Sequence, residues 1–320
     1  MPFWSRGLLK ISIIGTGRHS LNIRKICNSI KNLKIDFLFS RKKKYIKGYK
    51  VTKSFKDLLN SEIIFICVPP SMHLNVLKKL HNLKFKNYII CEKPLVNTLS
   101  GFKYIKKLPN FYKKRLFVNY NFVNSKLAKI ISKKVKNKLN GKLKYTDFQI
   151  SHGAAWLKSW RNDWRIKSRL GPIETTGIHY IHFLKKIFGN YKIITRNFSN
   201  SARNKGIDTV EFALKFSRTF SFFRFSYSEP HQINFKLIFS NAIILYNGKM
   251  LNYYYKRDTF NQKGRFIEPK LKENYKINFY KDWNYSIKKN IKKMCKIIKN
   301  KKFNNTKQLY DDLNVLKPFY

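Results

Sequence analysis

The chain has 320 residues, of which 43% are hydrophobic and 16% aromatic, which is the composition of a folded protein and excludes a largely disordered one. Its 68 Lys and Arg against 16 Asp and Glu give a formal net charge of +52, which attracts polyanions. The lysines are spread over nearly every segment, and the only tight cluster, residues 41–44, is short. We therefore expect nonspecific, salt-sensitive binding of polyanions but no specific nucleic-acid partner.

The four cysteines, Cys27, Cys67, Cys91 and Cys295, are far apart and show neither CxxC nor Cys/His spacing. Neither a zinc site, nor any other metal site, nor a disulfide framework is therefore expected, and a reducing cytoplasm is the simplest location. No apolar run approaches the roughly 20 residues that span a bilayer, so we expect no membrane association.

The first strong element is a largely β-branched run of four residues, 11–14, which ends in the turn Gly15-Thr16-Gly17-Arg18-His19-Ser20 and is followed by a helical stripe. Two glycines at this spacing are typical of a dinucleotide site, because they form the turn and let backbone N–H groups approach a pyrophosphate. The cofactor candidates here are Gly15, Gly17, Arg18 and His19. Because Ser20 stands where Gly or Ala is usual, an ordinary strand-to-helix turn is an equal alternative for this motif alone.

A second strand, residues 35–39, ends in Ser40 and Arg41. An acidic residue at this position would bind the ribose 2′-OH of NAD, whereas a hydroxyl and a guanidinium can bind the 2′-phosphate of NADP. The sequence therefore slightly favours NADP over NAD as the cofactor. The alternative for residues 41–44 is a solvated basic loop.

Polar and proline residues follow the next two strands, residues 63–68 and 88–91. Alternating strands and helices predict a doubly wound parallel sheet, so both following loops lie at its carboxyl edge, where ligands bind. The candidates in these loops are Pro69, Pro70, His73, Glu92 and Lys93. We expect His73 to be exposed there, as a neighbour of cofactor or substrate or as an ordinary surface residue at a helix start.

These motifs resemble those of the Gfo/Idh/MocA oxidoreductases, the glucose-fructose oxidoreductase and inositol dehydrogenase family. Besides the glycine turn, residues 68–73 are similar to the family's TPPxxH, and residues 92–94 are similar to its EKP signature. The resemblance implies a Rossmann domain, residues 1–120, and an α+β domain with an open, mainly antiparallel sheet, residues 121–320. It also implies that nicotinamide lies between the domains, that Lys93 reaches the substrate oxygen, and that the peptide bond after Lys93 is cis.

The chemistry of Lys93 agrees with that role. An ammonium group beside the oxygen of a secondary alcohol stabilises developing alkoxide charge as hydride leaves the carbon, and Glu92 can orient it. The alternative is a surface Glu–Lys pair before a proline.

The second half of the chain contains β-rich runs without long intervening helices, which independently predicts an antiparallel sheet. In similar proteins an exposed sheet face often finds a partner, which points to a homo-oligomer.

Within this half, residues 151–165 contain three tryptophans at spacing four and two arginines at spacing four. If this segment is helical, the residues form adjacent stripes that suit a sugar or nucleotide sugar, since indoles stack on sugar rings and guanidinium groups bind phosphate or carboxylate. The substrate candidates in it are Trp160, Arg161, Trp164 and Arg165, and a tryptophan core stripe is equally plausible.

Residues 171–182 resemble the family's second signature, a helix start of the form GGxxxDxGxHxxD. His179 matches the histidine that the family uses as general base or acid, and an imidazole is suited to that role. The sequence departs from this signature at two positions, since Thr175 and His182 stand where the family has aspartates. We expect Thr175 and His179 to share a helix face, which places Thr175 in the substrate site. Three consequences of these departures stay open: activity with Lys93 and His179 alone, a different substrate subclass, or loss of activity. A further alternative is that His179 has a purely structural role.

The sequence thus predicts an NAD(P)-dependent oxidoreductase that transfers hydride between nicotinamide and a secondary alcohol or ketone of a sugar or nucleotide sugar. Lys93 and His179 are the predicted catalytic residues. One alternative is a catalytically impaired, cofactor-binding regulator, and another is a polyanion-binding protein.

Overall fold

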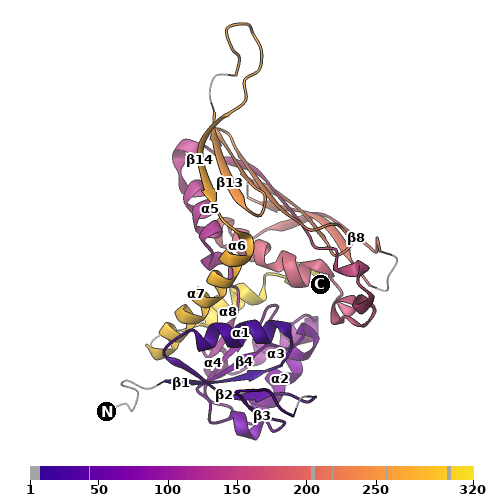
Figure 1. The fold of residues 1–320 in the computed structure, drawn as a ribbon, viewed down its shortest axis with the longest axis vertical. Coiled ribbons are helices and arrows are strands. Elements are labelled where there is room, and N and C mark those ends of the chain that lie inside the picture. Colours follow the sequence, from indigo (N-terminus) through magenta and orange to yellow (C-terminus); the bar gives the residue numbers. More distant parts are fainter. Residues whose placement is uncertain (1–7, 43, 203–205, 218, 257–258, 301–303) are drawn as a thin grey trace. The chain divides into compact units, whose positions relative to one another are not determined.

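The structure, a computed structural model, describes residues 8–42, 44–202, 206–217, 219–256, 259–300 and 304–320. Lys43, in the predicted basic cluster, lies outside the described residues. The chain divides into two compact units, both visible in Figure 1. The first comprises residues up to 121 together with 286–318 and 320, and the second comprises residues 122–285 and 319.

The first unit is built on a six-stranded parallel sheet in the order β3-β2-β1-β4-β5-β6. Its strands are β1 (Leu9–Ile14), β2 (Leu33–Phe39), β3 (Lys50–Thr52), β4 (Ile63–Ile66), β5 (Tyr88–Cys91) and β6 (Leu116–Val118). Strand order reverses between β1 and β4, so their carboxyl ends form the switch point at which such sheets bind ligands. The predicted doubly wound sheet is confirmed.

Helices of the first unit follow the strands along the chain. They are α1 (Arg18–Asn28), α2 (Pro70–Asn82), α3 (Leu99–Lys107) and α4 (Asn110–Lys113). In α1 the buried residues Ile23, Ile26 and Cys27 form the apolar stripe of an amphipathic helix. The helix begins directly after Gly17, so the glycine turn aims the first N–H groups of α1 at the switch point.

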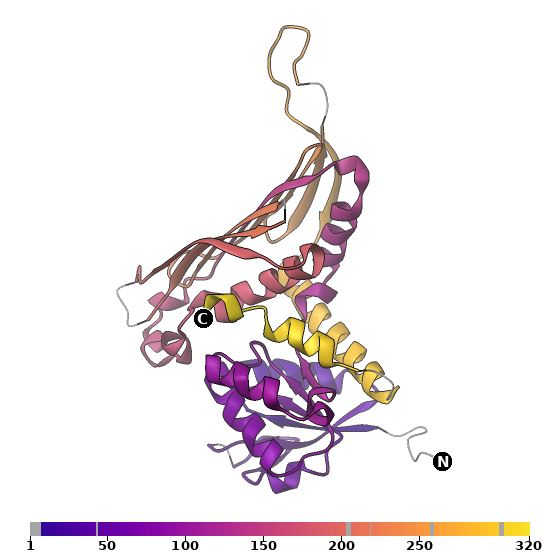
Figure 2. The ribbon, with the colours of Figure 1, turned by 180° about the vertical axis from the view of Figure 1, so that it is seen from behind.

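The C-terminal segment also belongs to the first unit. Helix α8 (Thr306–Leu313) contacts β6 and α4, and Figure 2 shows it beside this unit's helices. Helix α7 (Phe279–Lys299) clusters with the first unit from Ser286 onward. This differs from the predicted division into residues 1–120 and 121–320. Apolar periodicity predicts that the C-terminal segments are helical, but it does not predict which unit these helices pack against.

The second unit contains an eight-stranded sheet in the order β14-β13-β12-β11-β7-β10-β9-β8. Its strands are β7 (Leu143–Ser151), β8 (Lys192–Ser199), β9 (Thr209–Phe216), β10 (Thr219–Ser226), β11 (Gln232–Phe239), β12 (Ala242–Tyr246), β13 (Met250–Tyr255) and β14 (Lys270–Lys276). The pair β7–β10 is parallel and the other neighbours are antiparallel, which confirms the predicted mainly antiparallel sheet.

One face of this sheet forms the core of the second unit together with α5 (Lys126–Lys136) and α6 (Ile178–Phe188). Alternation along β10 shows how the faces differ, because Phe223 and Phe225 are buried while Phe220 and Phe222 are exposed. A Cβ on Gly177 would lie 2.7 Å from the Phe225 ring, so a glycine is needed where the start of α6 meets the sheet. Among the described helices, none has the length and apolar character needed to span a bilayer.

Candidate functional site

The glycine turn lies at the switch point of the first unit. Gly15 has a φ of +113°, and a Cβ there would lie 2.5 Å from the carbonyl oxygen of Cys67 at the end of β4. Gly17 has an ordinary φ of −76°, and a Cβ there would meet no described atom within 4 Å. Gly15 is therefore required by the fold, whereas Gly17 leaves open space before the first turn of α1, which fits a dinucleotide pyrophosphate.

The serine at the third position of the motif has a structural role. Ser20 is fully buried, and its hydroxyl donates to the Gly15 carbonyl at 2.6 Å. The departure from Gly or Ala therefore fastens the turn. Arg18 and His19, on the same turn of α1, are exposed and reachable by a ligand.

The end of β2 provides a second part of the candidate cofactor site. Ser40 is buried, and its hydroxyl lies 3.2 Å from that of Thr16 in the glycine turn. Arg41 is exposed, and its guanidinium lies 3.5 Å from the sulfur of Met72 in α2. The two residues thus differ, since Ser40 braces the turn while Arg41 presents a cation to solvent.

His73 was expected at the surface, and that expectation is wrong. The side chain is fully buried, with Nδ1 2.7 Å from the Pro94 carbonyl and Nε2 2.9 Å from the Val68 carbonyl. Burial lowers the pKa of His73 despite these carbonyls, so the ring is neutral at pH 7 and donates to one of them. His73 therefore ties together the loops after β4 and β5. Pro69 and Pro70 start α2 in the first of these loops.

Lys93 follows β5 at the same sheet edge and is half-buried, and the peptide bond to Pro94 is cis, as the resemblance implied. Glu92 is buried and accepts from His19 Nε2 at 2.8 Å and from Asn119 Nδ2 at 2.6 Å. Burial alone would raise the pKa of Glu92, but the His19 charge and these hydrogen bonds hold it below its usual value. Glu92 thus accepts hydrogen bonds from His19 and Asn119, and the orientation of Lys93 by Glu92 stays a prediction.

Sequence reasoning missed Asn119. The signal that the sequence offers is its place directly after the apolar run of β6, at the carboxyl edge where polar side chains reach a ligand. Asn119 is 1% exposed, and its side-chain Oδ1 accepts from Asn290 Nδ2 at 2.8 Å.

In the second unit, His179 lies in the first turn of α6 and is buried. Its ring meets that of Trp283 edge-on, with the centroids 4.6 Å apart. Residues 173–177, which lead into α6, form a π-helix, a form often found at functional sites. The segment thus departs from the regular α-helix that the prediction assumed, and the shared helix face of Thr175 and His179 stays a prediction. The hydroxyl of Thr175 bonds to that of Tyr227.

The tryptophan-rich segment is not an α-helix. Three short 3₁₀ turns cover residues 154–156, 158–162 and 164–167, so the predicted stripes do not form. Trp160 is buried against Tyr227, with ring centroids 5.0 Å apart, which is the predicted core alternative.

The other substrate candidates of this segment lie nearer to solvent. Trp164 and Arg161 are exposed, and Arg165 pairs with Asp163 at 2.7 Å. Tyr227 is a residue that sequence reasoning did not single out; it contacts both Thr175 and the ring of His152, whose centroid lies 4.8 Å away.

A parallel sheet of this order, with a glycine turn at its switch point, defines a dinucleotide-binding domain. Residues 9–120 match the model of the oxidoreductase family with an NAD-binding Rossmann fold, Gfo/Idh/MocA. This match over the first domain confirms the predicted resemblance and supports the predicted class of NAD(P)-dependent oxidoreductases. Among curated protein sequences, none matches the chain.

Solved structures share the fold over nearly the whole chain. A 3-ketoreductase from Actinomadura kijaniata, in complex with NADP and TDP-benzene, is 11% identical with a TM-score of 0.77, covering 97% of this chain and 95% of its own. An oxidoreductase from Agrobacterium radiobacter, in complex with NAD+, L-tartaric acid and magnesium, is 16% identical with a TM-score of 0.76, covering 97% and 94%. The myo-inositol 2-dehydrogenase of Lactobacillus plantarum is 17% identical with a TM-score of 0.72, covering 97% and 94%.

Proposed function

We propose that this protein transfers hydride between NAD(P) and a secondary alcohol or ketone of a sugar or nucleotide sugar, with Lys93 and His179 as its catalytic residues. The observation that carries the proposal is the position of Lys93. It follows β5 at the carboxyl edge of the sheet, within the segment that matches the family, and it neighbours a buried carboxylate. A half-buried ammonium there can act on a substrate oxygen.

A bound dinucleotide would supply the hydride acceptor or donor, with its pyrophosphate in the open space at Gly17 and held by the N–H groups of α1. The Lys93 ammonium would donate a hydrogen bond to the substrate oxygen and stabilise its developing negative charge. The His179 imidazole would take up the hydroxyl proton on oxidation and return it on reduction. The Trp283 ring packed against His179 restricts how the imidazole can turn.

The substrate class rests on side chains of the second unit and on one neighbour. Trp164 and Arg161 are exposed, so an indole face and a guanidinium are accessible for a sugar ring and a phosphate. A 3-ketoreductase described with TDP-benzene shares the fold, which supports a nucleotide sugar.

Two variants test the catalytic assignment. We expect Lys93→Met and His179→Asn to lower turnover at least about a thousandfold while the Kd for NADPH changes less than threefold. The control is Lys86→Met, an exposed lysine before β5, which should behave like the wild type. Full turnover in Lys93→Met would overturn the assignment, and failure of the wild type to bind either cofactor would overturn the function itself.

One observation favours a second function, a cofactor-binding regulator without turnover. Thr175 stands where the family has an aspartate, and its hydroxyl is engaged by Tyr227. No carboxylate from this position can then raise the pKa of a general base. Measurable oxidation or reduction of any sugar in a substrate panel excludes the regulator.

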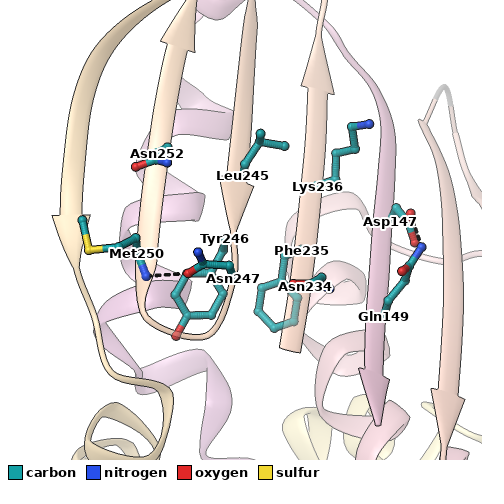
Figure 3. Close-up of a pocket in the computed structure, with 10 residues that line it drawn as sticks. All are labelled: Asp147, Gln149, Asn234, Phe235, Lys236, Leu245, Tyr246, Asn247, Met250 and Asn252. Carbon is teal, nitrogen blue, oxygen red and sulfur yellow. Dashed lines mark hydrogen bonds between the residues drawn. The ribbon is translucent and has the colours of Figure 1, made fainter. Parts of the chain in front are cut away.

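We also propose that the exposed sheet face pairs with a second copy of the chain. It carries Phe222, 41% exposed, and Leu245, 36% exposed, together with charges of both signs such as Asp147 and Lys236. Figure 3 shows Leu245, Asp147 and Lys236 around a pocket of about 430 Å³. In a chain of net charge +52, a face of mixed charge is where two copies repel each other least.

The oligomer proposal is tested by sedimentation at moderate salt. The wild type should be a dimer or larger, and Phe222→Lys should be a monomer with an unchanged circular dichroism spectrum. Leu139→Lys, at a residue 67% exposed and outside the sheet, is the control. A monomeric wild type at 100 µM would refute the proposal.

The four free cysteines agree with the reducing cytoplasm, which we propose as the location.

A further inference from the structure

A chain of side-chain hydrogen bonds leads from the interior of the first unit to the glycine turn. Asn290 Nδ2 donates to Asn119 Oδ1 at 2.8 Å, Asn119 Nδ2 donates to Glu92 Oε1 at 2.6 Å, and the same oxygen lies 2.8 Å from His19 Nε2. Asn290, Asn119 and Glu92 are 7%, 1% and 8% exposed, while the His19 side chain is 46% exposed. The interior end of the chain is thus fixed and the His19 end faces solvent.

The direction of these bonds is set by chemistry. The side-chain carbonyl of Asn119 accepts from Asn290, so the NH₂ group of Asn119 faces Glu92. Glu92 therefore accepts this hydrogen bond, which suits its ionised carboxylate. A buried carboxylate is costly without a balancing cation. The neighbouring imidazole meets this need when Nε2–H donates and the ring is protonated, so the network favours the imidazolium form of His19 over the neutral form.

Among the described residues, several elements contribute charged and titratable groups around His19. From the loop after β5, Glu92 favours the imidazolium and Lys93 opposes it. From the end of β4, the Cys67 thiol shares the field of Glu92, but burial raises its pKa, which leaves it neutral. From α1 itself comes the exposed Arg18, and from α7 comes the uncharged Asn290. Burial opposes the charge on His19, yet the charge and hydrogen bond of Glu92 prevail and raise its pKa.

We propose that Glu92 holds His19 as an imidazolium in the first turn of α1, where it binds the pyrophosphate of the dinucleotide and makes cofactor affinity depend on its protonation. The inference rests on the proposed cofactor site and adds to it a second role for Glu92, as counter-ion of His19. Open space before Gly17 and a first turn without acidic residues leave room for this anion. Asn119 and Asn290 are then positioning residues, which act on the cofactor through Glu92 and His19.

The pH dependence follows from the sign of the charge. An imidazolium attracts the pyrophosphate and a neutral ring does not, so affinity is full below the pKa of His19 and is lost as the pH rises through it. A charged hydrogen bond of this kind corresponds to about a tenfold change in Kd.

The experiment uses the full chain and ADP-ribose, because its pyrophosphate keeps its charge between pH 6 and 9 whereas the 2′-phosphate of NADP titrates near pH 6. Calorimetry at constant ionic strength should show the Kd of the wild type rising about tenfold across this range. In His19→Gln the Kd should equal the high-pH value of the wild type at every pH. In Glu92→Gln the rise should begin at lower pH. The control is His81→Gln, which removes a histidine bonded to Tyr104 in the same unit and should keep the wild-type profile.

A second measurement separates this inference from the cofactor site itself. The NMR titration of His19, assigned through His19→Gln, should give a pKa above 6.5 without any ligand and should fall in Glu92→Gln. A pKa below 6.5, an affinity that is flat with pH, or an unchanged slope in His19→Gln each overturns the inference. If ADP-ribose, NADH and NADPH fail to bind at every pH, the proposed cofactor site fails as well, whatever the NMR titration gives.

Discussion

The two glycines of the turn make a paired prediction, because both fit the dinucleotide motif but have different physical roles in this structure. Gly15→Ala places a Cβ 2.5 Å from the Cys67 carbonyl oxygen and 2.9 Å from its carbon, at a φ of +113°. Gly17→Ala meets no described atom within 4 Å, at a φ of −76°. The first substitution therefore disturbs the fold, whereas the second only fills space that a cofactor would occupy.

The magnitudes follow from these geometries. A non-glycine residue at such a positive φ costs about 1–3 kcal/mol, and the overlap with backbone of β4 adds to it, so we expect Gly15→Ala to lose about 3 kcal/mol. For a domain of this size that lowers the thermal midpoint by about 6–12 °C. Gly17→Ala should shift stability by less than about 1 kcal/mol, since restricting the unfolded chain offsets any small loss. Its Kd for NADH and NADPH should rise about tenfold or more.

The assays are thermal unfolding without cofactor and fluorescence titration with NADH and NADPH. Gly48→Ala is the control for the backbone cost alone, because Gly48 has a φ of +79° but no described atom within 4 Å of its Cβ position. It should lose about 1 kcal/mol and keep cofactor affinity. Wild-type stability of Gly15→Ala would refute the close approach to β4. Wild-type affinity of Gly17→Ala would refute the place of the pyrophosphate.

Three further substitutions test other parts of the structure. Arg41→Gln should raise the Kd of NADPH about tenfold and that of NADH less than threefold, because only NADPH offers a 2′-phosphate; equal effects in fluorescence titrations would contradict that contact. His73→Leu leaves one loop carbonyl without its donor and should cost about 2 kcal/mol in urea unfolding at pH 7–9. Because burial lowers the pKa of His73, the wild type should also lose stability as the pH falls below about 6.5, and His73→Leu should lack that loss. Asp282→Ala removes the carboxylate that accepts two backbone N–H groups at the start of α5, at 2.8 and 2.9 Å, and should cost about 2 kcal/mol, with Asp282→Asn intermediate; an unchanged urea midpoint would refute this cap.

The first sheet could be predicted from sequence because its signals are local. Residues 11–14 are apolar except for Ser12 and residues 63–68 are apolar over their whole length, as is typical of strands buried on both faces, and the glycine turn marks the end of the first run. The sequence therefore predicts that the loops after β4 and β5 lie at one sheet edge. Topology rules supplied what the local pattern did not.

The errors concern side chains whose surroundings come from distant segments. His73 turns inward because carbonyls of two loops lie over the start of α2, and its own neighbours in sequence do not show this. Thr175 bonds to Tyr227, which is 52 residues away. Residues 154–167 follow the packing of Trp160 on Tyr227 and not the four-residue spacing of their tryptophans. Periodicity assumes a regular helix, and tertiary contacts decide whether one forms.

The unequal numbers of acids and bases change how such a sequence is best interpreted. A lysine is so frequent here that its presence at one position says little, whereas an acid is one of only 16 and, where it is buried, needs partners. The buried acids illustrate the point. Asp208 accepts from the backbone N–H groups of residues 201 and 202, Asp282 caps α5, and Glu92 pairs with His19. A buried carboxylate also lowers the positive potential around it, so a cation beside it gains a defined place. Lys93 is therefore distinguished from the other lysines by the Glu92 that precedes it, and the function we propose depends on that pair of positions more than on the net charge.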